Sequence, residues 1–360
     1  MNDLSRRNML RAAGLGGLGL TGLLAACGGG DSTTAKATAT STSTASPASL
    51  KVALGWIKNV EFAGFWVADN RGYYTEENLD VTFLSGGPNT PDPTTSVSSD
   101  AADIGVHPAM QSVIEAIPKG NDFVVLGTQF QTSPGGLLSL ASDPVTTARD
   151  LVGAKILGQQ GVQATLDAVF AANGLKKDYS FVPVGYDPSP LVKKQGKAYT
   201  CFVTNQPITL EETSGMKEGK DYVTVTYADL GLPLYSNLVF VKRAMLDDKA
   251  DVLQRFMRAT IRGFQDNAED PAAAAKLAVE KYGADLGLQL KQQTRENELQ
   301  IPLMESDLTK AKGLFRIDQD LFAGDMFDAL KASGVAKLPD AEKVVDHAVL
   351  DAVFGGKSVI

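Results

Sequence analysis

The sequence predicts an α/β protein with two lobes, and three observations support this. From residue 50 onward, short apolar segments alternate with stretches of helical periodicity, which is typical of sheets covered by helices. The folded part, residues 50–360, has about 310 residues, more than one hydrophobic core usually holds. After residue 244 the pattern changes to long amphipathic helices, which we expect to form a helical C-terminal tail on lobe 1.

The alternating segments define the expected order of elements. We predict strands at 50–55, 79–84, 102–106, 123–127, 137–141, 155–158, 181–184, 198–203, 221–227 and 238–242, and helices at 62–70, 108–117 and 162–173. Because the last strand returns to the first α/β unit, the chain crosses twice between the units. We therefore expect residues 50–137 and 238–360 to form lobe 1, residues 138–237 to form lobe 2, and two crossover strands to join them.

The tail contains three predicted helical regions. Residues 250–267 place apolar side chains at the 3, 4 spacing of a helix face, and these are Val252, Leu253, Phe256, Met257, Ile261 and Phe264. Pro271 can open the next helix, where its missing N–H costs nothing. Residues 318–333 and 340–354 follow the same helical pattern, so lobe 1 should end in packed helices.

The first 27 residues predict an export address rather than folded structure. A positive segment with Arg6 and Arg7 precedes the apolar run 12–26, which is shorter than the about 20 apolar residues that a membrane span needs. The run ends in Leu24-Ala25-Ala26-Cys27, which resembles a lipobox, so we expect a signal peptide and a lipidated Cys27. Residues 5–11 resemble a twin-arginine signal, although ordinary secretory signals also contain paired arginines.

Residues 28–49 are almost entirely Gly, Ser, Thr and Ala and have no apolar periodicity. Such a segment cannot bury enough apolar surface to fold. We expect a disordered tether between the lipid anchor and lobe 1. The protein should then be exported and lipid-anchored to the outer face of the cell membrane, or periplasmic.

Composition excludes several classes of partner and site. A formal net charge of −8 argues against nucleic acid, whose phosphates require a basic face. The two histidines, His107 and His347, stand far apart without a Cys/His cluster, so no metal site and no cofactor are expected. If Cys27 is lipidated, Cys201 has no disulfide partner, and we expect an inert buried thiol.

Several segments together resemble a known family. They are residues 52–59 (VALGWIKN), 63–68 (AGFWVA), 72–81 (GYYTEENLDV), 102–106 (ADIGV), 150–156 (DLVGAKI) and 203–207 (VTNQP). In this order they resemble substrate-binding proteins of the thiamine-pyrimidine-synthase-like family, relatives of the sulfonate-, nitrate- and riboflavin-binding proteins. The resemblance covers nearly the whole chain after the tether.

The resemblance implies a two-lobed periplasmic-binding-protein fold, type II-like, that closes over a ligand and delivers it to the permease and ATPase of an ABC importer. Family members bind thiamine pyrimidine precursors, and relatives bind riboflavin or small anions such as sulfonates and nitrate. Yeast relatives are enzymes that make the thiamine pyrimidine with a Cys-rich motif. The corresponding stretch 199–203 keeps only Cys201, so we expect a binding protein and not an enzyme. We also expect a monomer.

The predicted loops beyond the strand ends carry the candidate ligand-binding residues. The candidates are Trp56, Asn59, Glu61, Phe62, Phe65, His107, Gln129, Gln160, Tyr199, Asn205, Gln206, Tyr235 and Asn237. Aromatic rings suit a planar heterocycle, and amides and a carboxylate can bind its polar edge. These loops carry one cation, Lys58, which favours a neutral or weakly cationic aromatic ligand over an anion.

Several candidates also have a structural alternative. Trp56 can belong to the core at the end of a strand, and so can Phe62 and Phe65, which share one face of a helix. Asn59 can cap the following helix, whose N-terminus also favours the charge of Glu61. Residues 205–207 can form only a turn. The sequence leaves these alternatives open.

Overall fold

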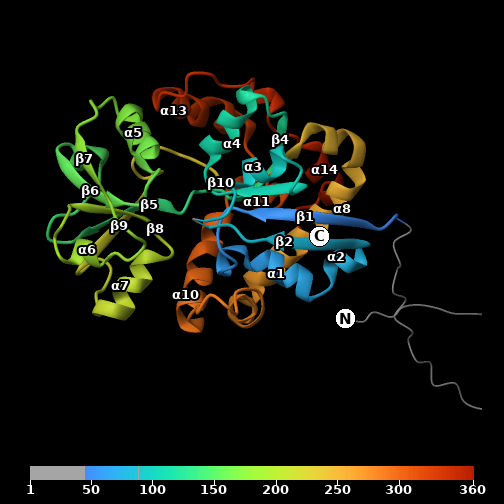
Figure 1. Cartoon of the computed structure of the whole chain (residues 1–360), viewed down its shortest axis with the longest axis horizontal. Coiled ribbons are helices and arrows are strands. Elements are labelled where there is room, and N and C mark those ends of the chain that lie inside the picture. The colour runs from blue at the N-terminus through green and yellow to red at the C-terminus, as the bar shows by residue number, and fades with distance from the viewer. Residues whose placement is uncertain (1–44, 88) are drawn as a thin grey trace, which may run out of the picture. The chain divides into compact units, whose positions relative to one another are not determined.

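The computed structural model describes residues 45–87 and 89–360. This part of the chain forms two five-stranded sheets with helices packed on them (Figure 1), which confirms the predicted α/β class with two lobes. The predicted signal peptide, the lipidated Cys27 and residues 28–44 of the predicted tether lie outside the described residues. Within the described ranges, no helix combines the length and the apolar character that a membrane crossing requires.

The first sheet, which defines lobe 1, is mixed. Its strand order is β2 (Leu79–Leu84), β1 (Ala48–Leu54), β3 (Ile104–His107), β10 (Ser236–Lys242), β4 (Phe123–Phe130). β1 pairs in parallel with β2 and β3, whereas β10 runs antiparallel to β3 and β4. The carboxyl ends of β1 and β3 therefore meet at one edge of the sheet.

The second sheet, which defines lobe 2, repeats this arrangement. Its strand order is β7 (Tyr179–Pro183), β6 (Ala154–Gly158), β8 (Ala198–Phe202), β5 (Gly135–Leu140), β9 (Tyr222–Thr226). β6 pairs in parallel with β7 and β8, while β5 runs antiparallel to β8 and β9. Here the carboxyl ends of β6 and β8 lie together.

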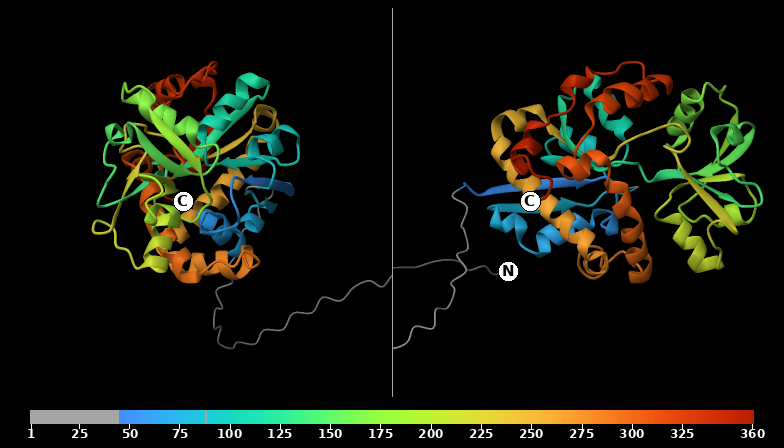
Figure 2. Two further views of the ribbon diagram at one scale, coloured as in Figure 1. Left: turned by 60° about the vertical axis from the view of Figure 1, so that its left-hand side comes forward. Right: turned by 180° about the vertical axis from the view of Figure 1, so that it is seen from behind.

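Two segments connect the sheets, as the crossover prediction requires. The chain leaves the first sheet after β4 and enters the second at β5, then returns from β9 to β10. In Figures 1 and 2 the strands of lobe 2, coloured green to yellow-green, form a sheet separate from the blue and teal strands of lobe 1. Residues 131–134 and 227–235 thus form the two crossovers.

Helices surround both sheets. Those between the strands of lobe 1 are α1 (Ala63–Asn70), α2 (Tyr73–Glu76), α3 (Pro93–Ser98) and α4 (Met110–Ala116), and a short 3₁₀ turn, η1 (Val60–Phe62), precedes α1. Those of lobe 2 are α5 (Gln163–Ala172), α6 (Ser189–Val192) and α7 (Gln206–Ser214). The tail contains α8 (Arg243–Glu269), α9 (Pro271–Leu277), α10 (Leu290–Gln300), α11 (Asp307–Lys312), α12 (Gln319–Leu321), α13 (Phe327–Ala332) and α14 (Ala348–Phe354).

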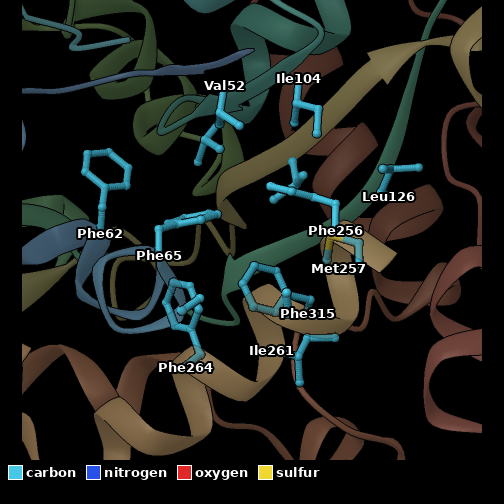
Figure 3. Packing of buried hydrophobic residues seen from close by; sticks show 14 of the residues in the cluster. Val52, Phe62, Phe65, Ile104, Leu126, Phe256, Met257, Ile261, Phe264 and Phe315 are labelled. Atoms are coloured by element: carbon cyan, nitrogen blue, oxygen red, sulfur yellow. The ribbon is translucent and has the colours of Figure 1, made fainter. Parts of the chain in front are cut away.

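An aromatic cluster joins α1 and α8 to the first sheet (Figure 3). The ring of Phe65 on α1 lies 5.3 Å from that of Phe264 and 6.4 Å from that of Phe256, both on α8. The two helices approach closely because Gly263 has no side chain: a Cβ there would lie 2.2 Å from the carbonyl oxygen of Gly64. The predicted apolar face of 250–267 is therefore the face that packs on lobe 1.

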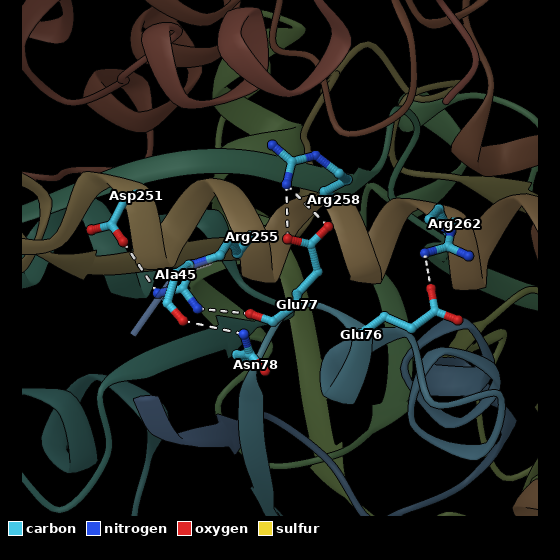
Figure 4. A network of polar contacts seen from close by, with 8 residues as sticks. All are labelled: Ala45, Glu76, Glu77, Asn78, Asp251, Arg255, Arg258 and Arg262. Atoms are coloured by element: carbon cyan, nitrogen blue, oxygen red, sulfur yellow. Dashed lines mark hydrogen bonds and ion pairs between the residues drawn. The ribbon is translucent and has the colours of Figure 1, made fainter. Parts of the chain in front are cut away.

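Ion pairs and backbone contacts also attach α8 to the end of α2 (Figure 4). Arg258 Nη1 donates to both carboxylate oxygens of Glu77, at 3.0 and 2.9 Å. The buried Arg255 donates to the carbonyl oxygen of Glu77 at 2.7 Å. Arg262 pairs with Glu76 at 2.7 Å one turn further along. These contacts fix the turn before β2.

The tail differs from the prediction at residues 340–354, where a continuous helix was expected. A 3₁₀ turn at Ala341–Lys343 is followed by a β-bridge between Val345 and Val125, and α14 begins only at Ala348. The helical prediction was wrong there because Val345 extends the edge of the first sheet, and Asp346 N also donates to Val125 O. Tertiary pairing overrides a local helical pattern at this edge.

Candidate functional site

A cavity of about 550 Å³ lies between the carboxyl ends of β1 and β3 in lobe 1 and those of β6 and β8 in lobe 2. Small-molecule sites usually measure about 300–1,000 Å³ and occur at such strand ends. Residues from the crossovers, among them Ser133 and Leu234, also line it. The two lobes and their connections thus enclose a volume suited to a small solute.

Aromatic side chains from both lobes line the cavity. Trp56 follows β1, and its ring meets the ring of Tyr186 of lobe 2 edge-on, with centroids 5.0 Å apart. Phe202, Tyr227 and Tyr235 provide further ring surface. Flat apolar surfaces of this kind bind planar ring systems by stacking.

Glu61 is held in the cavity wall by a buried amide network. It lies in η1, which Asn59 caps by accepting a hydrogen bond from Glu61 N at 3.1 Å. Asn237 Nδ2 on β10 donates to Glu61 Oε1 and to Gln129 Oε1, each at 3.0 Å. Gln129 Nε2 in turn donates to the carbonyl oxygen of Glu61 at 2.8 Å. These hydrogen bonds hold the carboxyl group of Glu61 in one position. The residue is buried, with only 4% of its surface exposed.

A second carboxyl group, that of Glu296 on α10, lines the same cavity and is 3% exposed. Its Oε2 accepts from Asn205 Nδ2 at 2.7 Å and from Gln293 Nε2 at 2.9 Å. Gln293 Oε1 also accepts from Val60 N at 2.8 Å, so α10 and η1 are joined directly. Asn205 precedes α7, and its bond to Glu296 connects lobe 2 with lobe 1.

Burial changes the proton affinity of both carboxyl groups. It raises the pKa of Glu61 to about 7, and the Asn237 hydrogen bond opposes the rise. Burial also raises the pKa of Glu296 to about 8, where the Asn205 bond opposes the rise and the charge of Glu61 adds to it. Near neutral pH the pair can thus exchange protons with the solvent or a ligand.

The described residues that line the cavity include no Lys, Arg or His. Its polar groups are side-chain amides such as Gln159, Gln206 and Gln292, hydroxyls such as Thr200, and the two carboxyl groups. The described part of the chain also contains no group of three or more His, Cys, Asp or Glu side chains placed to hold a metal ion. The arrangement offers hydrogen-bond acceptors and apolar rings to a ligand.

The structure brings one part of the predicted residue set together around the cavity. These are Trp56, Asn59, Glu61, Asn205, Gln206 and Tyr235. Gln129 and Asn237 do not line it, but they hold Glu61 as described. Tyr199 does not line it either, although its hydroxyl accepts a hydrogen bond from the cavity residue Gln159 at 2.8 Å.

Other predicted residues lie elsewhere. Phe62 and Phe65 are fully buried in the core of lobe 1, because both contact the aromatic cluster beneath η1 and α1. His107 ends β3, where its Nε2 contacts Asp92 Oδ2 at 2.9 Å and its Nδ1 accepts from Ala109 N. Gln160 is exposed, whereas its neighbour Gln159 lines the cavity.

Sequence reasoning missed Tyr186, Phe202, Tyr227, Gln293 and Glu296. The buried residues of α10 are all polar and recur at the helical spacing: Gln293, Glu296, Asn297 and Gln300. Polar residues at this spacing indicate a helix with a buried polar face. A search for apolar residues alone does not detect such a helix. Cys201, expected to be buried, is a buried free thiol at the cavity wall, and burial raises its pKa.

Curated proteins with similar sequences include two binding proteins and an enzyme. The riboflavin-binding protein RibY of Chloroflexus aurantiacus is 26% identical over 88% of this chain and 91% of its own length. The formylaminopyrimidine-binding protein of Halalkalibacterium halodurans is 26% identical over 71% and 77%. The 4-amino-5-hydroxymethyl-2-methylpyrimidine phosphate synthase of Legionella pneumophila is 26% identical over 62% and 71%.

Solved structures confirm the periplasmic-binding-protein fold. The periplasmic aliphatic sulphonate binding protein SsuA from Escherichia coli superposes with a TM-score of 0.62 and 14% identity, covering 84% of this chain and 93% of that one. Residues 59–274, more than half of the chain, match the family described as NMT1/THI5 like. This protein therefore belongs to the NMT1/THI5-like family.

Proposed function

We propose that this protein is the extracytoplasmic solute-binding component of an ABC importer and captures a small aromatic heterocycle between its lobes. The candidate ligands are a thiamine pyrimidine precursor and riboflavin. One observation carries the proposal: the cavity between the lobes combines aromatic walls with two buried carboxyl groups and has no cationic side chain among its described lining residues.

The chemistry of the wall supports this ligand class. Trp56 and Tyr186 supply rings from opposite lobes, so closure of the lobes can bring apolar surface to both sides of a flat molecule. The amides of Gln159 and Gln292 can donate to or accept from the edge of the ring. The similarity to a riboflavin-binding and a formylaminopyrimidine-binding protein favours the same class.

A small anion such as a sulfonate or nitrate is the second candidate, and one observation favours it. The first turns of α5 and α7 contribute Thr165 and Gln206 to the cavity, and helix N-termini attract anions. Glu61 and Glu296 oppose it, because either carboxyl group would repel an anion in this poorly solvated site whenever it ionises. A heterocycle, unlike a small anion, would use both the aromatic rings and the carboxyl groups of the cavity wall.

Enzymatic synthesis of a thiamine pyrimidine is the alternative from another class, and the Legionella relative represents it. We propose binding without turnover. The aromatic rings and hydrogen-bonding groups of the cavity are sufficient to hold a solute. Incubation of the purified protein with the bound heterocycle, followed by mass spectrometry, separates the two. Recovery of the unchanged compound is expected, and a chemically altered product would contradict binding alone.

We also propose that Cys27 is lipidated, that a tether ending before β1 joins it to the lobes at the outer face of the cell membrane, and that a permease and an ATPase are the partners. The predicted tether 28–49 is shortened at its end, because Ala48 and Ser49 pair with Leu79 and Asp80 of β2. Metabolic labelling with a tritiated fatty acid tests the anchor. Label should appear on the wild-type protein in membranes and be absent from Cys27→Ser. Equal labelling of both proteins would contradict the assignment.

A thermal-shift screen tests the proposed ligand class. The purified chain is heated with riboflavin, 4-amino-5-hydroxymethyl-2-methylpyrimidine, formylaminopyrimidine, taurine or nitrate. A ligand at about 100 times its Kd adds about 2.7 kcal/mol to the free energy of unfolding, which is sufficient for a measurable rise in Tm. A shift with a heterocycle that is lost in Trp56→Ala is the expected result, and a shift with anions alone would overturn the proposal.

A further inference from the structure

Within residues 45–87 and 89–360, each buried carboxyl group in the cavity has one oxygen to which no protein group donates. Glu61 Oε1 accepts from Asn237, but no group of the described residues donates to Glu61 Oε2. Glu296 Oε2 accepts two hydrogen bonds, and in the described structure Glu296 Oε1 accepts none. Both residues line the cavity. The two remaining oxygens are therefore available to a ligand.

The surroundings of these oxygens provide no compensating charge. Gln293 and Gln292 come from α10, Asn237 from β10, Gln129 from β4 and Asn205 from the start of α7, and all five are neutral amides. A buried carboxylate that lacks donors is costly, and the cost falls when a partner supplies N–H groups or positive charge. The cavity thus favours a ligand that is rich in donors.

We propose that Glu61 and Glu296 form a paired acceptor subsite for a nitrogen base that presents two N–H donors, one of them an exocyclic amine. The inference rests on the proposed function and narrows its ligand class. A protonated aminopyrimidine or another amidine-like edge carries adjacent donors and a positive charge, which carboxylates bind strongly.

The same geometry disfavours a ring edge made of carbonyl groups. The pyrimidine-dione edge of a flavin places one N–H between two carbonyl oxygens, and those oxygens would face unpaired carboxyl oxygens. Glu61 and Glu296 therefore discriminate between the two heterocycles that the shape of the cavity accepts. Discrimination of this kind is large because the wrong ligand leaves buried polar groups unpaired.

Substitution by glutamine tests the subsite, because it keeps the size and shape of each side chain while removing the carboxyl group. In Glu61→Gln the side-chain oxygen can still accept from Asn237, and in Glu296→Gln it can still accept from Asn205 and Gln293. What each variant loses is the ability to take up a negative charge and one acceptor oxygen. Glu298→Gln is the matched control, because Glu298 lies on the same helix with a 48% exposed side chain and is not among the residues that line the cavity.

The measurement is isothermal titration of each purified full-length protein with 4-amino-5-hydroxymethyl-2-methylpyrimidine, its 4-oxo analogue and riboflavin. We expect the aminopyrimidine to bind about 10- to 100-fold more weakly to Glu61→Gln and Glu296→Gln than to wild type, since each loses a charged hydrogen bond. Glu298→Gln should bind the aminopyrimidine within about twofold of the wild-type affinity.

The 4-oxo analogue should bind the wild-type protein at least about tenfold more weakly than the aminopyrimidine, because a carbonyl oxygen replaces the exocyclic amine. Circular dichroism verifies that all variants fold.

The other outcomes separate this inference from the proposed function. Unchanged affinity in both glutamine variants, or equal binding of the 4-oxo analogue, overturns the acceptor subsite while the proposed function stands. Binding of riboflavin alone has the same meaning. If the wild-type protein binds none of the heterocycles, the proposed function fails and this inference fails with it.

Discussion

The side-chain amide of Asn205, at the start of α7 in lobe 2, donates to Oε2 of Glu296 on α10 of lobe 1 at 2.7 Å. Lys291 and Glu212 form a second contact between the same two helices, at 3.4 Å. The Asn205 bond is buried on its acceptor side, whereas the Lys291 side chain is 88% exposed. The hydrogen bond is therefore the contact that should couple closure of the lobes to the state of the cavity.

We predict that Asn205→Asp opens the lobes. A carboxylate at this position would face Glu296 without a donor, and two like charges in a poorly solvated site repel. Small-angle X-ray scattering at about pH 9, where both groups are ionised, should show a larger radius of gyration than wild type. Lys291→Ala is the control and should scatter like wild type, because exposed ion pairs contribute little. Identical scattering of Asn205→Asp and wild type would contradict this role.

Trp56 and Tyr186 should slow the release of a bound ligand. Their rings meet across the lobes, so opening of the lobes around a bound ligand has to break this contact. In stopped-flow experiments with the ligand found by the thermal-shift screen, Tyr186→Ala should raise the dissociation rate about tenfold, equivalent to about 1.4 kcal/mol. Tyr186→Phe keeps the ring and should dissociate at nearly the wild-type rate. Equal rates for the Ala and Phe variants would show that the ring contact does not hold the ligand.

The raised pKa values of Glu61 and Glu296 predict a stability that depends on pH. Both carboxyl groups have an ordinary pKa near 4.5 in the unfolded chain, against about 7 and about 8 in the folded protein. The folded state therefore binds protons more tightly, so the ligand-free protein should lose stability as the pH rises from about 5 to about 9. For Glu61 the shift corresponds to a loss on the order of 3 kcal/mol.

Glutamine variants test this titration directly. Because Glu61→Gln and Glu296→Gln cannot ionise, both should have a higher Tm than wild type at about pH 9 and nearly the same Tm at about pH 5. Urea unfolding at the two pH values gives the same comparison as a free energy. Parallel pH profiles for wild type and variants would mean that the carboxyl groups are not the source of the dependence.

The close approach of α1 and α8 predicts an unfavourable glycine-to-alanine substitution. In Gly263→Ala the new methyl group would lie 2.2 Å from Gly64 O and 2.7 Å from Ala68 Cβ, so the helices must separate. We expect a loss of about 1–3 kcal/mol in the free energy of unfolding, although alanine otherwise stabilises a helix. Gly324→Ala, whose Cβ would meet no atom within 4 Å, should be neutral or stabilising. Equal effects in chemical denaturation would contradict the packing account.

The sequence predicted the sheets well because their strands are short apolar runs between turn residues. The second strand was expected at residues 79–84, and β2 has these bounds. The expected helix at 340–354 was wrong because Val345 pairs with Val125, a residue 220 positions away in the chain, and a local pattern contains no information about that partner.

The candidate site was predicted less completely, because the sequence does not show in which direction each side chain points. Trp56 and Phe65 are both aromatic and lie near the end of β1, yet one lines the cavity and the other is fully buried in the core. Glu296 was missed because α10 contains mostly polar residues and resembles a solvated helix. The side chains of its buried polar face have partners in distant parts of the chain, in η1, at Asn205 and, for Asn297, at Asn267.

The most direct measurement of the central claim is a crystal structure of the protein with the heterocycle that gives the largest thermal shift. We predict that the ring lies in the cavity between the lobes against Trp56, with N–H groups directed at Glu61 Oε2 and Glu296 Oε1. A heterocycle bound outside this cavity, or a cavity occupied by an anion at the N-termini of α5 and α7, would contradict the account.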